Sequence, residues 1–216
     1  MLQYQIIPVT PFQQNCTLIW CDQTGQAALI DAGGESERLL EQVRKRGLKL
    51  EKLWVTHGHI DHVGAVGSLH QQGHWPIEGP HQGDDYWLDL VPEAARNYGF
   101  PAAVKFQPDR WLDDADQVTL GKETLEILHC PGHTPGHVVF FHRNQGVAWV
   151  GDVLFAGSVG RSDFPGGDGP TLIRSIRDKL FPLGADVRFV PGHGPMSSFA
   201  EERQRNPFVA DRLFPR

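Results

Sequence analysis

The sequence predicts an α/β domain that uses the whole chain. Short stretches with strand periodicity alternate with stretches of helical periodicity along nearly its full length. With 216 residues, 40% of them hydrophobic, the chain can bury about 70% of its unfolded surface. It therefore needs neither a disulfide nor a metal to form a core. We find no internal repeat, low-complexity tract or linker, and we expect one domain over residues 1–216.

Strands and helices alternate in the first half of the chain. Alternating polarity with β-branched and aromatic residues predicts strands at residues 3–9, 15–21, 27–30 and 52–56. Helical spacing predicts helices at residues 35–46, 61–72, 84–90 and 93–98. In the first helix, Leu39, Leu40 and Val43 share one face, and Gly47 is a suitable residue to end it.

The second half has the same organisation. Strands are predicted at residues 124–129, 137–142, 147–150 and 187–190, and helices at residues 171–181 and 199–205. Residues 157–169 form a glycine-rich loop that is long for a simple connection. Loops of this kind often carry function, so we expect this one to border a site.

Composition excludes several classes of function. The net charge is −6, and no block of Lys and Arg provides the basic surface that a nucleic-acid-binding protein needs. The N-terminus lacks the features of a signal peptide, and no apolar stretch is long enough for a membrane span. The three cysteines form no CxxC pair, which favours reduced thiols. We therefore expect a cytoplasmic protein without a nucleic-acid, membrane or obligate protein partner.

Histidine is over-represented. Eleven of the 216 residues are histidines, which is about 5% of the chain, whereas ordinary composition would give roughly 2%. Three of them lie in the segment THGHIDH, between a predicted strand and a predicted helix. His57 and His59 point the same way on an extended chain, and Gly58 allows a tight turn between them. Asp61 and His62 follow on the first helical turn, and this ligand set suits Zn, Fe or Mn.

Other potential ligands follow other predicted strands. His133 lies in PGHTPGH, Asp152 follows the strand at 147–150, and His193 lies in PGHGP after the strand at 187–190. Each comes after a strand and a turn of small residues. Functional groups commonly gather at strand ends because the sheet holds them rigidly.

These segments together resemble the signature of the metallo-β-lactamase fold, and within it the glyoxalase II-like hydrolases. The matching segments are THGHIDH, CPGHTPGH, VGDVLF and PGHGP. The chain is most similar to the single-domain, YcbL-type bacterial enzymes, whose pattern includes GRSDFPGGD, here residues 160–168. The resemblance implies a four-layer αββα sandwich with its site at one edge, between the two sheets.

The resemblance also implies a set of metal ligands. It makes His57, His59 and His133 ligands of a first metal ion. Asp61, His62 and His193 would bind a second ion, and Asp152 would bridge both. Two divalent ions are expected, with Zn favoured and Fe or Mn as alternatives. A metal-bound hydroxide would be the nucleophile, with Asp61 and Asp152 as the catalytic carboxylates.

Two further residues are candidates at the site. Asp31 matches a family position near the metals and would hydrogen-bond a ligand imidazole; the alternative is a carboxylate at the start of the next helix. Arg161 stands nine positions after Asp152, where the family has a basic residue, and would pair with a carboxylate of glutathione. The alternative is an arginine on a mobile surface loop. Asp163 and Pro195 replace family aromatics, which weakens the expectation of tight glutathione recognition.

The function that the resemblance implies is hydrolysis of a small-molecule thioester, with S-D-lactoylglutathione giving D-lactate and glutathione. The chain ends soon after His193, so we expect no C-terminal glutathione-binding helical domain. The main alternative is a persulfide dioxygenase with one iron, which shares HxHxDH and a similar loop. Lactonase or another ester hydrolase activity is a lesser alternative. A lactamase, a nuclease and a structural metal module are disfavoured.

Overall fold

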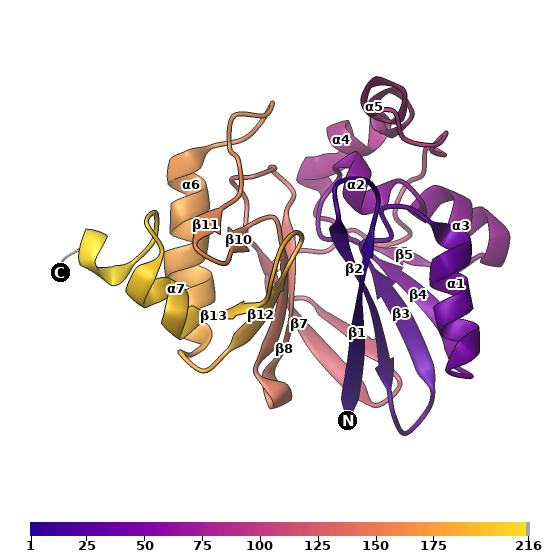
Figure 1. The fold of residues 1–216 in the computed structure, drawn as a ribbon, viewed down its shortest axis with the longest axis horizontal. Coiled ribbons are helices and arrows are strands. Elements are labelled where there is room, and N and C mark those ends of the chain that lie inside the picture. The colour runs from indigo at the N-terminus through magenta and orange to yellow at the C-terminus, as the bar shows by residue number, and fades with distance from the viewer. Residues whose placement is uncertain (215–216) are drawn as a thin grey trace.

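Two β-sheets pack face to face at the centre of the molecule, and helices cover the outer face of each sheet (Figure 1). The computed structural model describes residues 1–214. The first sheet and its helices come from the first half of the chain, and the second sheet comes from the second half. The αββα sandwich predicted from the sequence is therefore confirmed.

The first sheet has the strand order β1–β2–β3–β4–β5. Its strands are β1 (Leu2–Val9), β2 (Gln14–Cys21), β3 (Gln26–Ile30), β4 (Lys49–Trp54) and β5 (Ile77–Glu78). β2 runs antiparallel to both of its neighbours, β1 and β3, whereas β4 runs parallel to both of its neighbours, β3 and β5. Parallel neighbours need a crossover connection, and helices α1 (Ser36–Lys45) and α3 (Val66–Gly73) lie on these crossovers.

The second sheet has the strand order β13–β12–β9–β8–β7–β6. Its strands are β6 (Gln117–Leu120), β7 (Glu123–His129), β8 (Val138–His142), β9 (Val147–Gly151), β12 (Arg188–Pro191) and β13 (Ser197–Ser198). Only the β9–β12 pair is parallel. A separate hairpin consists of β10 (Leu154–Phe155) and β11 (Ser158–Val159).

Short helices complete the outer layers. They are α2 (Ile60–Val63), α4 (Asp85–Asp89), α5 (Val91–Tyr98), α6 (Gly169–Arg174) and α7 (Phe199–Arg205). Single turns of 3₁₀-helix lie at Gln82–Asp84, Arg143–Gln145, Phe181–Leu183 and Asp211–Leu213. No helix within residues 1–214 is both long enough and apolar enough to span a bilayer.

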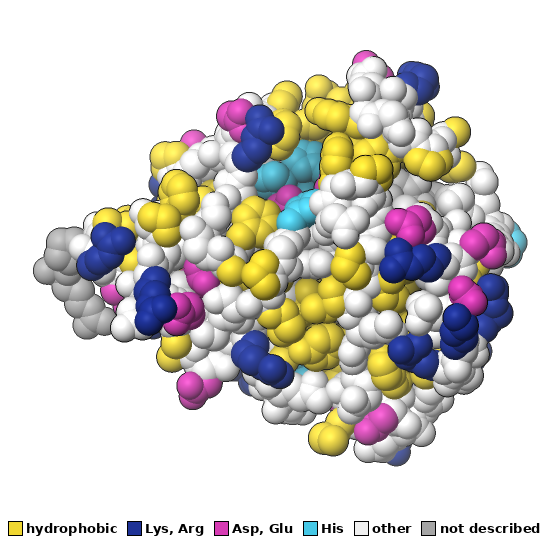
Figure 2. All heavy atoms as spheres, in the orientation of Figure 1, with side chains coloured by type: hydrophobic (Ala, Val, Ile, Leu, Met, Phe, Trp, Pro, Cys, Tyr) yellow, Lys and Arg dark blue, Asp and Glu magenta, His cyan; other side chains and the backbone are white. Residues whose placement is uncertain are grey.

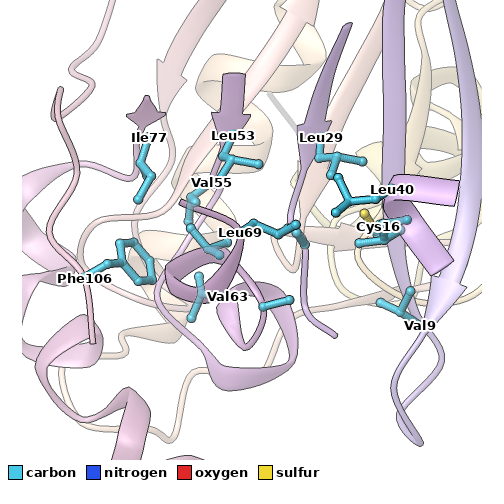
Figure 3. Packing of buried hydrophobic residues seen from close by; sticks show 14 of the residues in the cluster. Val9, Cys16, Leu29, Leu40, Leu53, Val55, Val63, Leu69, Ile77 and Phe106 are labelled. Atoms are coloured by element: carbon cyan, nitrogen blue, oxygen red, sulfur yellow. The ribbon is translucent and has the colours of Figure 1, made fainter. Parts of the chain in front are cut away.

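The central strands, such as β3, β8 and β9, are buried on both faces because each sheet lies between the other sheet and a helical layer. In β3, Ala27 and Leu29 face the helices, whereas Ala28 and Ile30 face the second sheet. Figure 3 shows the helix-side layer, where strand residues pack against side chains of α1 and α3. This double burial explains why the strands appear in the sequence as nearly continuous apolar runs.

Three differences from the sequence prediction have local causes. The helix predicted at residues 61–72 is broken into α2 and α3, because Gly64 packs against the Gly33 carbonyl and the Ala65 amide donates to Ala32. The helix predicted at residues 171–181 begins as α6 but continues as a π-helix over Ser175–Leu180. Some edge and hairpin strands were not predicted: the two-residue strands show no periodicity, and the four-residue edge strand β6 was missed as well.

The topology directs several strands to one edge of the sandwich. β3 and β4 are parallel, as are β9 and β12, so each pair ends at a common edge. β7 is two antiparallel steps from β9 and therefore runs in the same direction. The loops that follow these strands are consequently neighbours in space.

We predict that replacing Phe140 of β8 with alanine will destabilise the fold strongly. Its ring stacks on Trp54 of β4 at 5.4 Å between ring centroids and links the two sheets. A buried Phe-to-Ala change leaves a cavity and costs about 3–5 kcal/mol of unfolding free energy. Urea denaturation of Phe140→Ala measures this loss. The exposed Phe208 is the matched control, and Phe208→Ala is expected to change stability by less than about 0.5 kcal/mol. Equal losses in both variants would contradict the prediction.

Candidate metal centre

The loops at the common edge bring the predicted ligands together. The segment from His57 to His62 follows β4, His133 follows β7, Asp152 follows β9 and His193 follows β12. Figure 2 shows histidine and acidic atoms at the bottom of a hollow between the two halves, with hydrophobic surface around it. All seven residues predicted as ligands therefore lie in one place, although they come from four separate loops.

The first group consists of three histidines. His57, His59 and His133 each offer a ring nitrogen within 4.8 Å of the others. His59 Nδ1 and His133 Nε2 are 2.9 Å apart. The centroid of the His57 ring lies 4.8 Å from that of the His59 ring and 4.9 Å from that of the His133 ring. Three nitrogens that converge from two loops can hold one metal ion.

The second group combines a carboxylate with two imidazoles. Asp61, His62 and His193 likewise offer donor atoms within 4.8 Å of one another. Asp61 Oδ2 lies 3.0 Å from His193 Nε2 and 3.8 Å from His62 Nε2. The mixed oxygen and nitrogen set suits a divalent ion.

Asp152 lies between the two groups. Its carboxylate oxygens are 3.7 Å from His133 Nε2, 3.3 Å from His62 Nε2 and 3.7 Å from His193 Nε2. Asp152 therefore contacts both groups, which is the position a bridging ligand would need. Gly192 must be small here, because a side chain on it would collide with Asp152 Oδ1.

The unpaired atoms of the cluster fit a metal-binding role. Among the described residues, His57 Nε2, His62 Nε2 and Asp152 Oδ1 are buried without a hydrogen-bond partner. Buried polar atoms are rarely left unpaired, because each loses its hydrogen bonds to water. These atoms, together with His59 Nε2, which is also buried and unpaired, fit a role in holding metal ions.

The charges of the cluster also suit a cation. Burial lowers the pKa values of His57 and His133, and lowers that of His59 to about 3, so these rings are neutral and present a lone pair. Burial opposes ionisation of Asp152, but His62 and the other imidazoles hold its pKa well below the usual range. The pKa of Asp61 is lowered as well, against its burial, chiefly by His62. The first group thus offers neutral nitrogens beside two negative carboxylates, and these carboxylates raise the pKa values of His62 and His193 against their burial.

Asp31 and Thr56 orient two of the histidines. Asp31 Oδ2 accepts a hydrogen bond from His62 Nδ1 at 2.8 Å and another from the Thr56 hydroxyl at 2.7 Å. That hydroxyl lies 3.0 Å from His57 Nδ1, whose N–H it can accept. Both rings are therefore held by Nδ1, and Nε2 of each is directed to the cluster. Asp31 thus makes the contact with an imidazole that the sequence resemblance implied.

His137 lies next to the cluster but has a different set of contacts. Its Nε2 accepts the backbone N–H of Asp152 at 3.1 Å, and its ring stacks on His57 at 4.5 Å. The Nε2 lone pair is thereby occupied. The structure accordingly places His137 as a support for Asp152 and His57.

Asp84 is a residue of this region that sequence reasoning missed. Its buried carboxylate accepts hydrogen bonds from Gly58 N and Thr134 Oγ1, both at 2.8 Å, and from Gly136 N at 2.6 Å. It thereby ties the loop of His57 and His59 to the loop of His133. Burial raises its pKa to about 6. The signal available in the sequence was an acidic residue at the start of a predicted helix, which is common in proteins without functional sites.

A cavity of about 940 Å³ opens above the cluster. His59, Asp61, His133, Asp152 and His193 lie among its lining residues. Two aromatic side chains cover the first group of histidines: the rings of Trp87 and Phe164 lie 4.6 Å and 4.9 Å from the His59 ring. Neither was identified from the sequence, because aromatic residues are usual in any core. The cavity is large enough for a small-molecule substrate.

Arg161 lies at the cavity, as predicted, and its loop is ordered by contacts with the cluster. Its backbone carbonyl accepts a hydrogen bond from His133 Nδ1 at 2.6 Å. Its guanidinium forms two hydrogen bonds with Asp163, at 2.9 and 2.8 Å, and lies 4.5 Å above the Phe164 ring. The glycine-rich loop therefore borders the site through both its backbone and its side chains.

Known proteins resemble the chain over nearly its whole length. The model of the metallo-beta-lactamase superfamily matches residues 9–193. A hydroxyacylglutathione hydrolase, GloC, from Haemophilus influenzae is 46% identical, and the match covers 96% of this chain and 98% of that protein. The B3 metallo-beta-lactamase BLEG-1 has a TM-score of 0.87 and 32% identity, with coverage of 96% and 99%. TTHA1623 in a di-iron-bound form has a TM-score of 0.85 and 36% identity, with coverage of 95% and 100%.

We predict that Asp84→Asn will weaken metal binding. The amide of asparagine would present N–H groups to the Gly58, Thr134 and Gly136 donors that now bond to the Asp84 carboxylate. The loop of His57 and His59 would therefore separate slightly from the loop of His133. Loss of such supporting contacts costs about 10- to 100-fold in metal affinity. Metal titration with a competing chelator, followed by mass spectrometry of the bound metal, measures the change. Asp89→Asn removes the same charge from the exposed face of α4 and should leave metal affinity unchanged. If Asp84→Asn folds and binds metal like the wild type, Asp84 does not position the ligands.

Proposed function

The chain belongs to the metallo-beta-lactamase superfamily, and from this membership and its site we propose that it is a glyoxalase II-type hydrolase that cleaves S-D-lactoylglutathione. The single observation that carries the proposal is the convergence of seven His and Asp side chains under an open cavity. The 46% identity to a hydroxyacylglutathione hydrolase supports the choice of substrate.

The ligand set proposed for this chain is the one the sequence implied. His57, His59 and His133 would hold one ion, Asp61, His62 and His193 would hold a second, and Asp152 would contact both. When bound, two divalent ions would supply a water of lowered pKa and polarise the thioester carbonyl. Zn is the favoured metal, with Fe and Mn as alternatives. The di-iron form of TTHA1623 supports iron as an alternative.

The chain's own residues would prepare the reaction in three ways. Asp31 and Thr56 fix the orientation of His62 and His57, so that the donor atoms need not rearrange. Asp61 and Asp152 are ionised and line the cavity, so either can accept a hydrogen bond from a water molecule and orient it. The aromatic cover over His59 limits access of bulk water to that group.

The leaving group needs little help from the protein. The thiol of glutathione resembles a cysteine side chain, with a pKa of about 8.5, so it departs readily as a thiolate. No strong general acid is required. The acidic pair Asp61 and Asp152, which stays ionised, is therefore compatible with a thioester substrate. An amine leaving group would need protonation.

Three other reactions of this fold are compared with the thioesterase. The persulfide dioxygenase needs one iron held by two histidines and an aspartate. The likeness to BLEG-1 makes a β-lactam the second comparison substrate. A lactone is a third, because the same cavity could admit an ester. A cytoplasmic location and the absence of protein or nucleic-acid partners remain part of the proposal.

We predict that the purified, metal-loaded protein will release D-lactate and a free thiol from S-D-lactoylglutathione without consuming oxygen. Thiol release is followed with a chromogenic disulfide, and oxygen with an electrode. Glutathione persulfide with oxygen should give no sulfite, and nitrocefin, a chromogenic β-lactam, should be hydrolysed much more slowly. Sulfite formation with oxygen uptake would contradict the proposal in favour of the dioxygenase.

We also predict that the site needs both groups of ligands. His133→Ala and Asp152→Ala should each lower thioesterase activity by at least about 100-fold and reduce the number of ions bound per chain, since loss of even a supporting contact costs up to that much. Activity assays with metal analysis of the same samples measure both effects. His74→Asn changes an exposed histidine outside the site and serves as the control. Full activity of Asp152→Ala with one bound ion would rule out the two-metal arrangement.

A further inference from the structure

The walls of the cavity are mainly apolar, and its charge is unevenly distributed. Aromatic and aliphatic side chains form most of the wall, including those of Phe12, Tyr98, Phe155, Val159, Phe164 and Pro195. Asp61 and Asp152 place two negative charges at its floor. Of the lining residues, all of which lie in the described part of the chain, only Arg161 carries a permanent positive charge. Arg161 is therefore the lining side chain best suited to pair with a carboxylate at the cavity wall.

One edge of the Arg161 guanidinium, formed by Nε and Nη2, is already occupied. Its Nε donates to Asp163 Oδ1 at 2.9 Å, and its Nη2 donates to Oδ2 at 2.8 Å. This two-bond arrangement is the one in which arginine binds carboxylates most strongly. Asp163 raises the pKa of Arg161, and Arg161 in turn lowers the pKa of Asp163, so both remain charged. A substrate carboxylate that approaches this edge meets a pair with no net charge.

The pair has a fixed position relative to the metal site. The Arg161 carbonyl accepts the hydrogen bond from His133 Nδ1, which fixes the backbone. Phe164 lies beneath the guanidinium and also packs against His59 and His133. The side chain is therefore held by Phe164 from below and by Asp163 at its edge. This geometry differs from that of a mobile surface arginine.

We propose that Asp163 determines substrate specificity, by competing with the carboxylate of a glutathione thioester for Arg161. The inference rests on the proposed thioesterase function and adds to it. Asp163 selects against thioesters whose thiol part is anionic, relative to those whose thiol part is uncharged. Because both side chains are two-thirds exposed, the competition is modest in size.

The test compares the wild type with Asp163→Asn. Asparagine has the same shape but no charge, so Arg161 can bind a substrate carboxylate. The dissociation constant of S-methylglutathione, a thioether that cannot be hydrolysed, should fall about two- to five-fold in calorimetry. The kcat/KM for S-D-lactoylglutathione, divided by the kcat/KM for the D-lactoyl thioester of N-acetylcysteamine, should rise by a similar factor. The rise should come from a lower KM for the glutathione thioester. Salt should reduce the gain, since the pair is exposed.

Two further variants show whether Asp163 acts on substrate binding through Arg161. Asp168→Asn removes one charge from the same loop, away from the lining residues, and should leave the dissociation constant unchanged. In Arg161→Ala/Asp163→Asn the gain should disappear, because Asp163 acts through Arg161. Equal or weaker binding of S-methylglutathione by Asp163→Asn would overturn the inference. The binding assay needs no turnover, so a wild type that hydrolyses neither thioester would refute the proposed function alone.

Discussion

The burial of the Asp152 carboxylate among imidazoles is the interaction on which the site depends. A buried carboxylate is costly unless charged or hydrogen-bonding groups surround it. Here His62, His133 and His193 come from three different loops and approach it within 3.7 Å. The strands before these loops must therefore end at one edge, and both sheets are needed. The αββα arrangement meets this requirement, since β4 of the first sheet and β7 and β12 of the second sheet end at the same edge as β9, which carries Asp152.

The side chains of the cluster could be found from the sequence because they lie in four short segments that each follow a strand and that together resemble a family signature. The HxHxDH segment carries its own geometry, and Gly192 must be small to make room for Asp152. Asp84, Trp87 and Phe164 could not be found this way. Their roles arise from contacts between segments far apart in the chain, and each alone has the appearance of an ordinary helix or core residue. The sequence predicts donor atoms well, but not the groups that hold their loops together.

The same reasoning applies to the fold. Strands buried on both faces, such as β3 and β8, were predicted because long apolar runs are distinctive. The break between α2 and α3 was not, since the reason lies in the close approach of Gly64 to Gly33, a tertiary contact. Edge strands such as β5 and β13 contain two residues each and exist only through their partners. Local periodicity thus predicts the centre of each sheet better than its edges.

The loop of Arg161 connects the proposed metal site with the proposed determinant of substrate choice. Its backbone orients His133, while its side chains shape the cavity wall, so a single short segment serves both tasks. Changes in the backbone would disturb a proposed metal ligand, whereas changes in the exposed side chains Arg161 and Asp163 would not. Specificity in this site can therefore change through side chains alone, while the positions of the metal ligands stay fixed. The exposed salt bridge is the part of the site where a substitution alters what binds without altering the proposed catalytic groups.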